Sequence, residues 1–461
     1  MLQTPRPHPT IVQTAEPTQN AGIAAKLSRL SESSAAREGL WVLAGQGLAT
    51  LIALGMDSLL FRQLPQADRG TLSAALGLRN ILLYVADMGL ALATVRVASA
   101  YVGRGERDKA AAVFRRALGT RCLLATLVAA LTAVLAPALC GFPLAAPGRV
   151  KLVFACAAAL LGMSATSWGV DVAQSTRRFG FYFAHQVVEA ALRFAAVAAV
   201  FLLLAPKVEI SAELLLWALA IAATLAGLFS LFIQRKDAAH APLDSAAKDE
   251  MFQQLRAFGR YAWAIALLQT VSGFVELFIV QWQIGSTETA VFEGARRLAS
   301  ILPLLGGALV TILLPRAAQL NSSEECGAYV KKSLLASSAM ALIFAGGLAL
   351  CSGFVVPLLW GDRYAASIPA LRWLCLAHAF SIVINPLALV LFPLQRLGLL
   401  LTLIVCALAL QIGLGLWLIP QHGALGGAWS TLAAKAVTMI LFAVAVQIAL
   451  NRKHALPPSK V

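Results

Sequence analysis

Residues 333–359 read SLLASSAMALIFAGGLALCSGFVVPLL and contain no charged side chain. A helix needs about 20 apolar residues to cross the hydrocarbon core of a bilayer, so this stretch is long enough to span a membrane. Eleven further stretches of similar character fill the chain. The sequence therefore predicts an all-α membrane protein with twelve spans, at about 39–61, 71–99, 117–140, 151–173, 183–205, 212–234, 258–282, 290–314, 333–359, 366–392, 398–419 and 424–449.

The composition agrees with a membrane protein, because 59% of the 461 residues are hydrophobic and only 13% are charged. A soluble domain carries about 25% charged residues, and a soluble fold would need twelve helices that are apolar on every face. The seven cysteines are scattered, mostly in apolar spans, without the spacing of metal ligands. We therefore expect them to be buried hydrophobic residues, and we expect no metal or other cofactor.

The positive charge follows the topology of the chain. Of the 37 Lys and Arg residues, 23 fall in or at the border of the N-terminal tail, the even-numbered loops and the C-terminal tail, 6 fall in the odd-numbered loops, and 8 lie within spans. Such an asymmetry is the positive-inside rule, which places both termini in the cytoplasm. The net charge of +15 therefore indicates orientation in a membrane and not a nucleic-acid partner.

The longest internal polar segment separates six spans from six. An even number of spans in each half makes the halves parallel repeats, related by an axis along the membrane normal. Asp57 and Glu276 take matching places in spans 1 and 7, and Arg96 and Arg316 close spans 2 and 8. Two six-helix lobes around a central cavity predict an alternating-access transporter with its substrate between the lobes. The expected parts are a cytoplasmic tail 1–38, an N-lobe 39–234, a cytoplasmic linker 235–257, a C-lobe 258–449 and a cytoplasmic tail 450–461.

Four stretches resemble the bacterial polysaccharide, O-antigen-type flippases. FRQLPQADRGTLSAALGLRNILLYVADMGLALATVRVASAY resembles the first hairpin of that family, and EGARRLASILPLLGGALVTILLPRAAQL resembles its span 8. LLWGDRYAASIPALRWL is similar to the entry to span 10, and LIPQHGALGGAWST is similar to the link between spans 11 and 12. The order and spacing of these stretches carry the resemblance from about residue 38 to 450.

The resemblance implies membership of the multidrug/oligosaccharidyl-lipid/polysaccharide exporter superfamily. Such flippases move an undecaprenyl-diphosphate-linked oligosaccharide across the bacterial inner membrane, for surface polymers such as the O-antigen of lipopolysaccharide or an exopolysaccharide. The implied partners are this lipid-linked oligosaccharide, membrane lipids and other polysaccharide-assembly membrane proteins. Relatives export drugs or flip lipid II. The lipid II branch usually has fourteen spans, which disfavours that alternative here without excluding it.

Cations within the spans are candidates for a substrate-binding cavity. An ionisable residue inside a bilayer costs about 2.5–3.5 kcal/mol on insertion scales and marks a functional site by default. A diphosphate headgroup needs cations, since guanidinium groups donate paired hydrogen bonds to phosphate oxygens. Arg79 and Arg297 lie on repeat-equivalent spans and could face each other across a central cavity. The full candidate set is Arg79, Arg193, Arg296, Arg297 and Lys435.

Some of these cations also have a structural explanation. Glu189 and Arg193 are four residues apart, as are Glu293 and Arg297, and this spacing favours ion pairs within one helix. Each pair could simply neutralise itself for membrane insertion. Arg296 could extend to the outer interface. Arg79 and Lys435 have no such local partner.

Carboxylates within the spans are candidates for coupling transport to protons or sodium ions. A carboxylate in an apolar site can take up and release a proton during a transport cycle. We expect Asp57 and Glu276, which the repeat makes equivalent, to be the best candidates, with Asp87 as a third. The alternative is that each carboxylate pairs with a neighbouring Arg or with the backbone.

Two rival functions differ in their chemistry. A membrane-embedded polysaccharide polymerase needs catalytic groups on a sizeable external loop, whereas the predicted external loops are short and carry no nucleophile, metal or nucleotide motif. We therefore expect no enzymatic activity. A multidrug cation antiporter of the same superfamily would need an aromatic, weakly charged or acidic cavity. The mixed charges within the spans favour an anionic headgroup.

Overall fold

The computed structural model describes residues 34–204, 208–238, 249, 253, 260–304, 306, 323–391 and 397–451. Most of the predicted tails and of the linker lies outside these residues, as does Arg316. Every element in the described ranges is a helix. The prediction of an all-α membrane protein is confirmed for this part of the chain.

The first half of the chain forms one group of helices. In chain order these are α2 (Ser34–Gln63), α3 (Gln66–Asp87), α4 (Leu90–Gly103), α5 (Arg107–Val134), α6 (Ala136–Gly141), α7 (Val150–Ser175), α8 (Phe179–Ala199) with the π-helical turn η1 (Val200–Leu204), and α9 (Ala212–Ala238). The helices α7 and α9 pack so closely that a Cβ on Gly162 would lie 2.5 Å from the carbonyl oxygen of Ala223. Small residues permit such close contacts between membrane helices.

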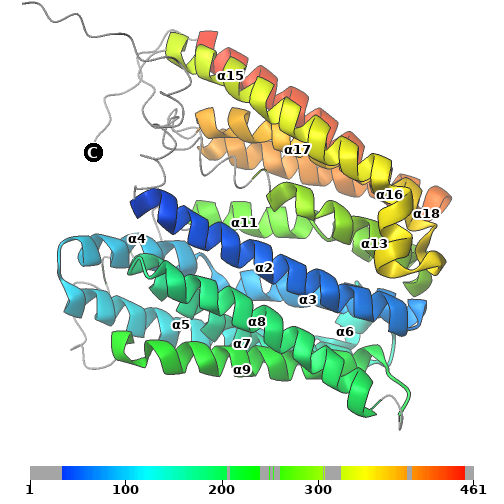
Figure 1. The fold of residues 1–461 in the computed structure, drawn as a ribbon, viewed down its shortest axis with the longest axis horizontal. Coiled ribbons are helices and arrows are strands. Elements are labelled where there is room, and N and C mark those ends of the chain that lie inside the picture. The colour runs from blue at the N-terminus through cyan, green and yellow to red at the C-terminus, as the bar shows by residue number, and fades with distance from the viewer. Residues whose placement is uncertain are drawn as a thin grey trace, which may run out of the picture.

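The second half forms the other group. Its helices are α11 (Arg260–Ser272), α12 (Val275–Gln283), α13 (Ser286–Ala299), α15 (Ser323–Ala341), η3 (Leu342–Gly346), α16 (Gly347–Trp360), η4 (Asp362–Tyr364), α17 (Ser367–Leu391) and α18 (Leu397–Asn451). Figure 1 shows α15, α16, α17 and α18 on one side and α4, α5, α7, α8 and α9 on the other, with α2, α3, α11 and α13 between them. We call the two groups the N-lobe and the C-lobe. The residue boundaries given for the lobes above stay predictions.

Nine helices of the described residues are long and apolar enough to cross a membrane, or ten if α3 and α4 form one bent span. These two helices meet at an angle of 47°, where Met88 and Gly89 both have positive φ. The helix α18 contains a 44-residue apolar stretch, Leu401–Val444, and is interrupted at Gly423, whose backbone is not helical. The interruption lies where the sequence predicts the turn between spans 11 and 12. The total of twelve spans stays a prediction.

The two lobes meet most closely where α3 crosses α13. A Cβ on Gly70 would lie only 1.8 Å from the carbonyl oxygen of Ser286, and one on Gly77 would lie 2.8 Å from the ring of Phe274. The hydroxyl of Thr71 donates to that of Ser286 at 3.1 Å. The absence of side chains at the two glycines therefore allows the lobes to touch.

Further contacts join the lobes near the same end of the molecule. The hydroxyl of Ser58 donates to the carbonyl of Leu359 at 2.7 Å, and Arg363 Nη2 donates to the carbonyl of Leu64 at 3.0 Å. The side-chain amide of Gln281 donates to the carbonyl of Leu144 at 2.8 Å. The charge distribution of the loops predicts that this end faces away from the cytoplasm. The lobes are thus held together at the predicted outer end.

Candidate substrate cavity between the lobes

A cavity of about 420 Å³ lies between α2 and α8 of the N-lobe and the C-terminal end of α13 with the residues that follow it. Its wall is mixed, with apolar side chains from α2 and several polar or charged ones. The polar and charged members are Gln46, Thr50, Gln186, Glu189, Arg193, Arg297 and Ser300. Since both lobes contribute to the wall, a ligand in this cavity would contact both.

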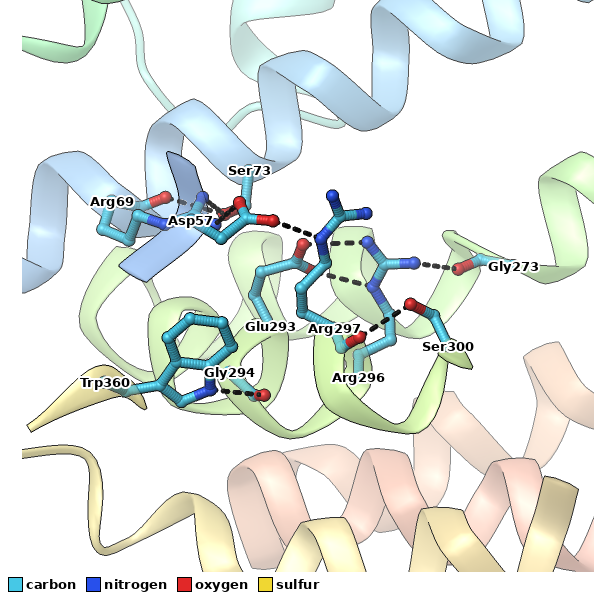
Figure 2. Close-up of polar contacts among 10 residues, drawn as sticks. All are labelled: Asp57, Arg69, Ser73, Gly273, Glu293, Gly294, Arg296, Arg297, Ser300 and Trp360. Atoms are coloured by element: carbon cyan, nitrogen blue, oxygen red, sulfur yellow. Dashed lines mark hydrogen bonds and ion pairs between the residues drawn. The ribbon is translucent and has the colours of Figure 1, made fainter. Parts of the chain in front are cut away.

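Two guanidinium groups from opposite lobes line this cavity. Arg193 of α8 pairs with Glu189 one turn earlier, and its Nε is buried without a hydrogen-bond partner. Arg297 of α13 donates from Nε to Asp57. In Figure 2 the two terminal nitrogens of Arg297 carry no interaction with the residues drawn. The cavity thus offers guanidinium donors that no residue of the described part of the chain accepts.

Asp57 connects the two lobes. Its carboxylate is 4% exposed, and it accepts a hydrogen bond from Arg69 Nη2 at 3.1 Å in its own lobe and another from Arg297 in the other lobe. Arg69 is itself buried, stacks over the ring of Phe61 at 4.1 Å and donates to Ser73 at 2.5 Å. Figure 2 shows this carboxylate between the two arginines. Asp57 therefore pairs with neighbouring arginines. This pairing is the alternative to an ion-coupling role that the sequence analysis left open.

The four-residue spacing of Glu293 and Arg297 suggested an ion pair that the structure does not contain. Glu293 instead pairs with Arg296, through bonds of 2.6 Å and 2.9 Å, and Arg296 also donates to the carbonyl of Gly273 at 3.3 Å. Positions three and four residues apart are both neighbours on a helix. The nearer guanidinium satisfies Glu293, and Arg297 is left to pair with Asp57 (Figure 2). Arg296 does not line the cavity.

Arg79 is placed differently from the expectation. It is only 6% exposed, it is not part of the cavity wall, and it forms no ion pair with any described residue. Its charge is close enough to those of Arg193 and Glu189 to interact with them. The expectation that Arg79 faces Arg297 is therefore corrected: Arg193 lines the cavity opposite Arg297, and Arg79 does not line it.

Glu276 lies inside the C-lobe. It is 3% exposed, and its carboxylate accepts hydrogen bonds from Gln411 Nε2 at 2.5 Å and from the hydroxyl of Thr431 at 2.7 Å. Lys435 follows Thr431 by one turn of α18 and interacts electrostatically with Glu276, although no ion pair within 4 Å forms between them. Glu276 and Asp57 take matching places in the sequence repeat, yet their surroundings differ.

Asp87 belongs to a largely buried ion-pair cluster at the bend between α3 and α4. Its carboxylate pairs with Arg121 at 2.9 Å and accepts hydrogen bonds from the backbone N–H groups of Gly89 and Ala91. Arg121 pairs also with Asp171 at 2.6 Å. The sequence analysis missed Arg121, although its position within the predicted span 117–140 was a signal. Arg69 gave no such signal, because it precedes the predicted start of its span.

The sequence matches the model of a known family over residues 35–321, and that family is described as "Polysaccharide biosynthesis protein". The chain belongs to this family. No curated protein matches the sequence. The family resemblance inferred from the four sequence stretches is thereby confirmed.

Solved structures of similar fold are membrane transporters. The lipid II flippase MurJ, in an inward closed conformation, has a TM-score of 0.67 at 13% identity, over 88% of this chain and 87% of its own. An inward-facing MATE multidrug resistance transporter of the MOP superfamily has a TM-score of 0.63 at 13% identity, over 90% of this chain and 100% of its own. An outward-facing MATE structure has a TM-score of 0.55 at 12% identity, over 91% and 96%. The chain therefore has the fold of MOP-superfamily transporters and is a multi-pass membrane protein.

Proposed function

We propose that this protein is a flippase that moves an undecaprenyl-diphosphate-linked oligosaccharide across the bacterial cytoplasmic membrane by alternating access. The observation that carries the proposal is the pair of guanidinium groups, Arg193 and Arg297, that opposite lobes present to one cavity. Membership of a polysaccharide biosynthesis family supports the substrate class. The asymmetry of Lys and Arg supports an orientation with both termini in the cytoplasm.

The chemistry of the cavity suits a diphosphate. Its oxygens accept paired hydrogen bonds from guanidinium groups, and such charge-assisted bonds are strengthened where water is scarce. A diphosphate on the free terminal nitrogens of Arg297 would share the positive charge of the guanidinium that pairs with Asp57 through Nε. Substrate binding would thus weaken a contact that holds the lobes together, which couples binding to opening of the outer end.

Among the three carboxylates expected to couple transport to an ion, we propose Glu276 for that role. The carboxylates of Asp57 and Asp87 are each paired with an arginine, so both have a structural explanation. Among the described residues, Glu276 instead meets only neutral side-chain donors within 4 Å, from Gln411 and Thr431. Its charge state can therefore change with a bound proton or sodium ion without breaking an ion pair.

Export of cationic drugs is the second candidate function. The observation in its favour is the carboxylate of Glu189 in the cavity wall, which could attract a cation. Arg193 already pairs with this carboxylate, which reduces its availability. A lipid II substrate carries the same diphosphate and would satisfy the same arginines.

Lipid analysis of cells depleted of this protein tests the proposal. Polyprenyl-linked lipids are measured by mass spectrometry, and surface polysaccharide is stained in the same cells. We expect the diphosphate-linked oligosaccharide to accumulate and the surface polymer to disappear, with the mass separating an oligosaccharide from a lipid II precursor. Unchanged lipids and polymer together with new sensitivity to cationic drugs would refute the proposal in favour of drug export.

Complementation with variants tests the cavity itself. Arg193→Gln and Arg297→Gln each remove one guanidinium from the wall, and we expect each to restore little surface polymer at normal expression. The matched control is Arg178→Gln, because Arg178 is exposed and pairs with Asp237 at 2.9 Å away from the cavity. Full complementation by both cavity variants would show that the cavity does not bind a diphosphate.

A further inference from the structure

A second cavity, of about 300 Å³, lies within the N-lobe and is walled by α3, α4, α5, α7 and α8. It shares two wall residues, Gln186 and Glu189, with the cavity between the lobes. The two cavities are thus separated by no more than one turn of α8. A ligand whose charged part sits beside Arg193 could extend a neighbouring group into this N-lobe cavity.

Each carboxylate of the N-lobe cavity already has a cationic partner. Arg121 pairs through Nη2 with both Asp87 and Asp171, while its Nε and Nη1 are buried without a hydrogen-bond partner among the described residues. Glu189 pairs with Arg193. The carboxylates are therefore not free to bind a cation. Their excess of negative charge still opposes a second anionic group in the cavity.

The uncharged polar groups of the same wall are unused. The side chains of Tyr84, Ser164, Ser167 and Gln186 line the cavity and have no hydrogen-bond partner within the part of the chain that the structure describes. Ser164 is 5% exposed. Hydroxyl and amide groups that line a cavity without a protein partner are available to a polar ligand with donors and acceptors of its own.

We propose that the N-lobe cavity binds the first sugar of the lipid-linked glycan, and that this sugar is uncharged. The inference rests on the proposed flippase function, which places the diphosphate beside Arg193. Sugar hydroxyls both donate and accept hydrogen bonds, as Ser164, Ser167 and Gln186 require. The exposed ring of Tyr84 offers an apolar face to the C–H groups of a sugar ring. Asp87 and Asp171 disfavour a sugar that bears a carboxylate.

Binding of three lipids to the purified full-length protein tests this site. The probes are undecaprenyl diphosphate alone, the same lipid carrying one N-acetylglucosamine, and the same lipid carrying one glucuronic acid. Titrations in nanodiscs compare the wild type with the double variant Ser164→Ala/Ser167→Ala. The matched control is Ser175→Ala. It removes a hydroxyl from the same helix, and this hydroxyl donates to the carbonyl of Asp171.

We expect the N-acetylglucosamine lipid to bind at least about fivefold more tightly than the bare lipid, as two neutral hydrogen bonds would provide. The double variant should lose this gain and still bind the bare lipid as the wild type does, and Ser175→Ala should retain it. Glucuronic acid should add no affinity. Equal affinity for the bare and the N-acetylglucosamine lipids, or a gain that survives in the double variant, overturns the inference but not the flippase proposal. Failure of the bare lipid to bind overturns both.

Discussion

Substitution of Gly70 by alanine should shift the protein away from the conformation described here. The added Cβ would lie 1.8 Å from the backbone carbonyl oxygen of Ser286, whereas carbon and oxygen atoms in close contact lie about 3.3 Å apart. The two lobes must therefore separate by about 1.5 Å at this point. Overpacking of this kind costs typically about 1–3 kcal/mol. A free-energy change of that size shifts a two-state equilibrium by roughly 5- to 150-fold towards the state in which α3 and α13 are apart.

Disulfide cross-linking measures this shift directly. The hydroxyl oxygens of Thr71 and Ser286 are 3.1 Å apart, so Thr71→Cys and Ser286→Cys, in a protein without its native cysteines, should cross-link when the lobes touch. Addition of Gly70→Ala should slow the cross-linking several-fold in membranes. The control is Gly119→Ala, because a Cβ there meets no atom within 4 Å. Equal cross-linking rates in the two backgrounds would mean that the contact of α3 with α13 is not part of a conformational equilibrium.

Three further substitutions test other parts of the structure. Asp57→Asn leaves Arg69 buried without a carboxylate, which should cost about 3 kcal/mol and lower the melting temperature in detergent; an unchanged melting temperature would contradict the ion pair. Glu276→Gln should abolish the dependence of transport in vesicles on a proton or sodium gradient while substrate binding persists, and a retained ion dependence would exclude Glu276 as the coupling site. Gly162→Ala should destabilise the N-lobe by about 1–3 kcal/mol through contact with Ala223, so wild-type stability of this variant would show that α7 and α9 can move apart freely.

The spans were predictable because they depend on one property, the length of apolar sequence. Each predicted span overlaps a helix, although much of 290–314 lies outside the described residues. The bend between α3 and α4 was not predicted. Its cause is the positive φ at Met88 and Gly89, a conformation that a hydropathy pattern does not encode.

The pairing of charges was only partly predictable. Glu189 and Arg193 pair as their spacing suggested, because both side chains lie on one face of one helix. Arg297 pairs with a residue 240 positions away, and only the packing of the two lobes brings Asp57 to it. Residue spacing identifies possible ion-pair partners within one helix. It does not show whether a charged residue from another helix is the preferred partner.

The predicted sequence repeat likewise does not predict which groups a residue contacts. The different partners of its two matched carboxylates bear on the transport mechanism. Asp57 and Glu276 occupy matching places in spans 1 and 7, yet Asp57 pairs with the opposite lobe while Glu276 bonds to α18 of its own lobe. A carboxylate between the lobes changes their separation when its partner is taken away. A carboxylate within one lobe changes the packing of that lobe when its charge changes. Transport coupled to an ion needs both effects, since a lobe contact must respond to the substrate and an internal site must respond to the ion. Our proposals assign the first effect to Asp57 and the second to Glu276.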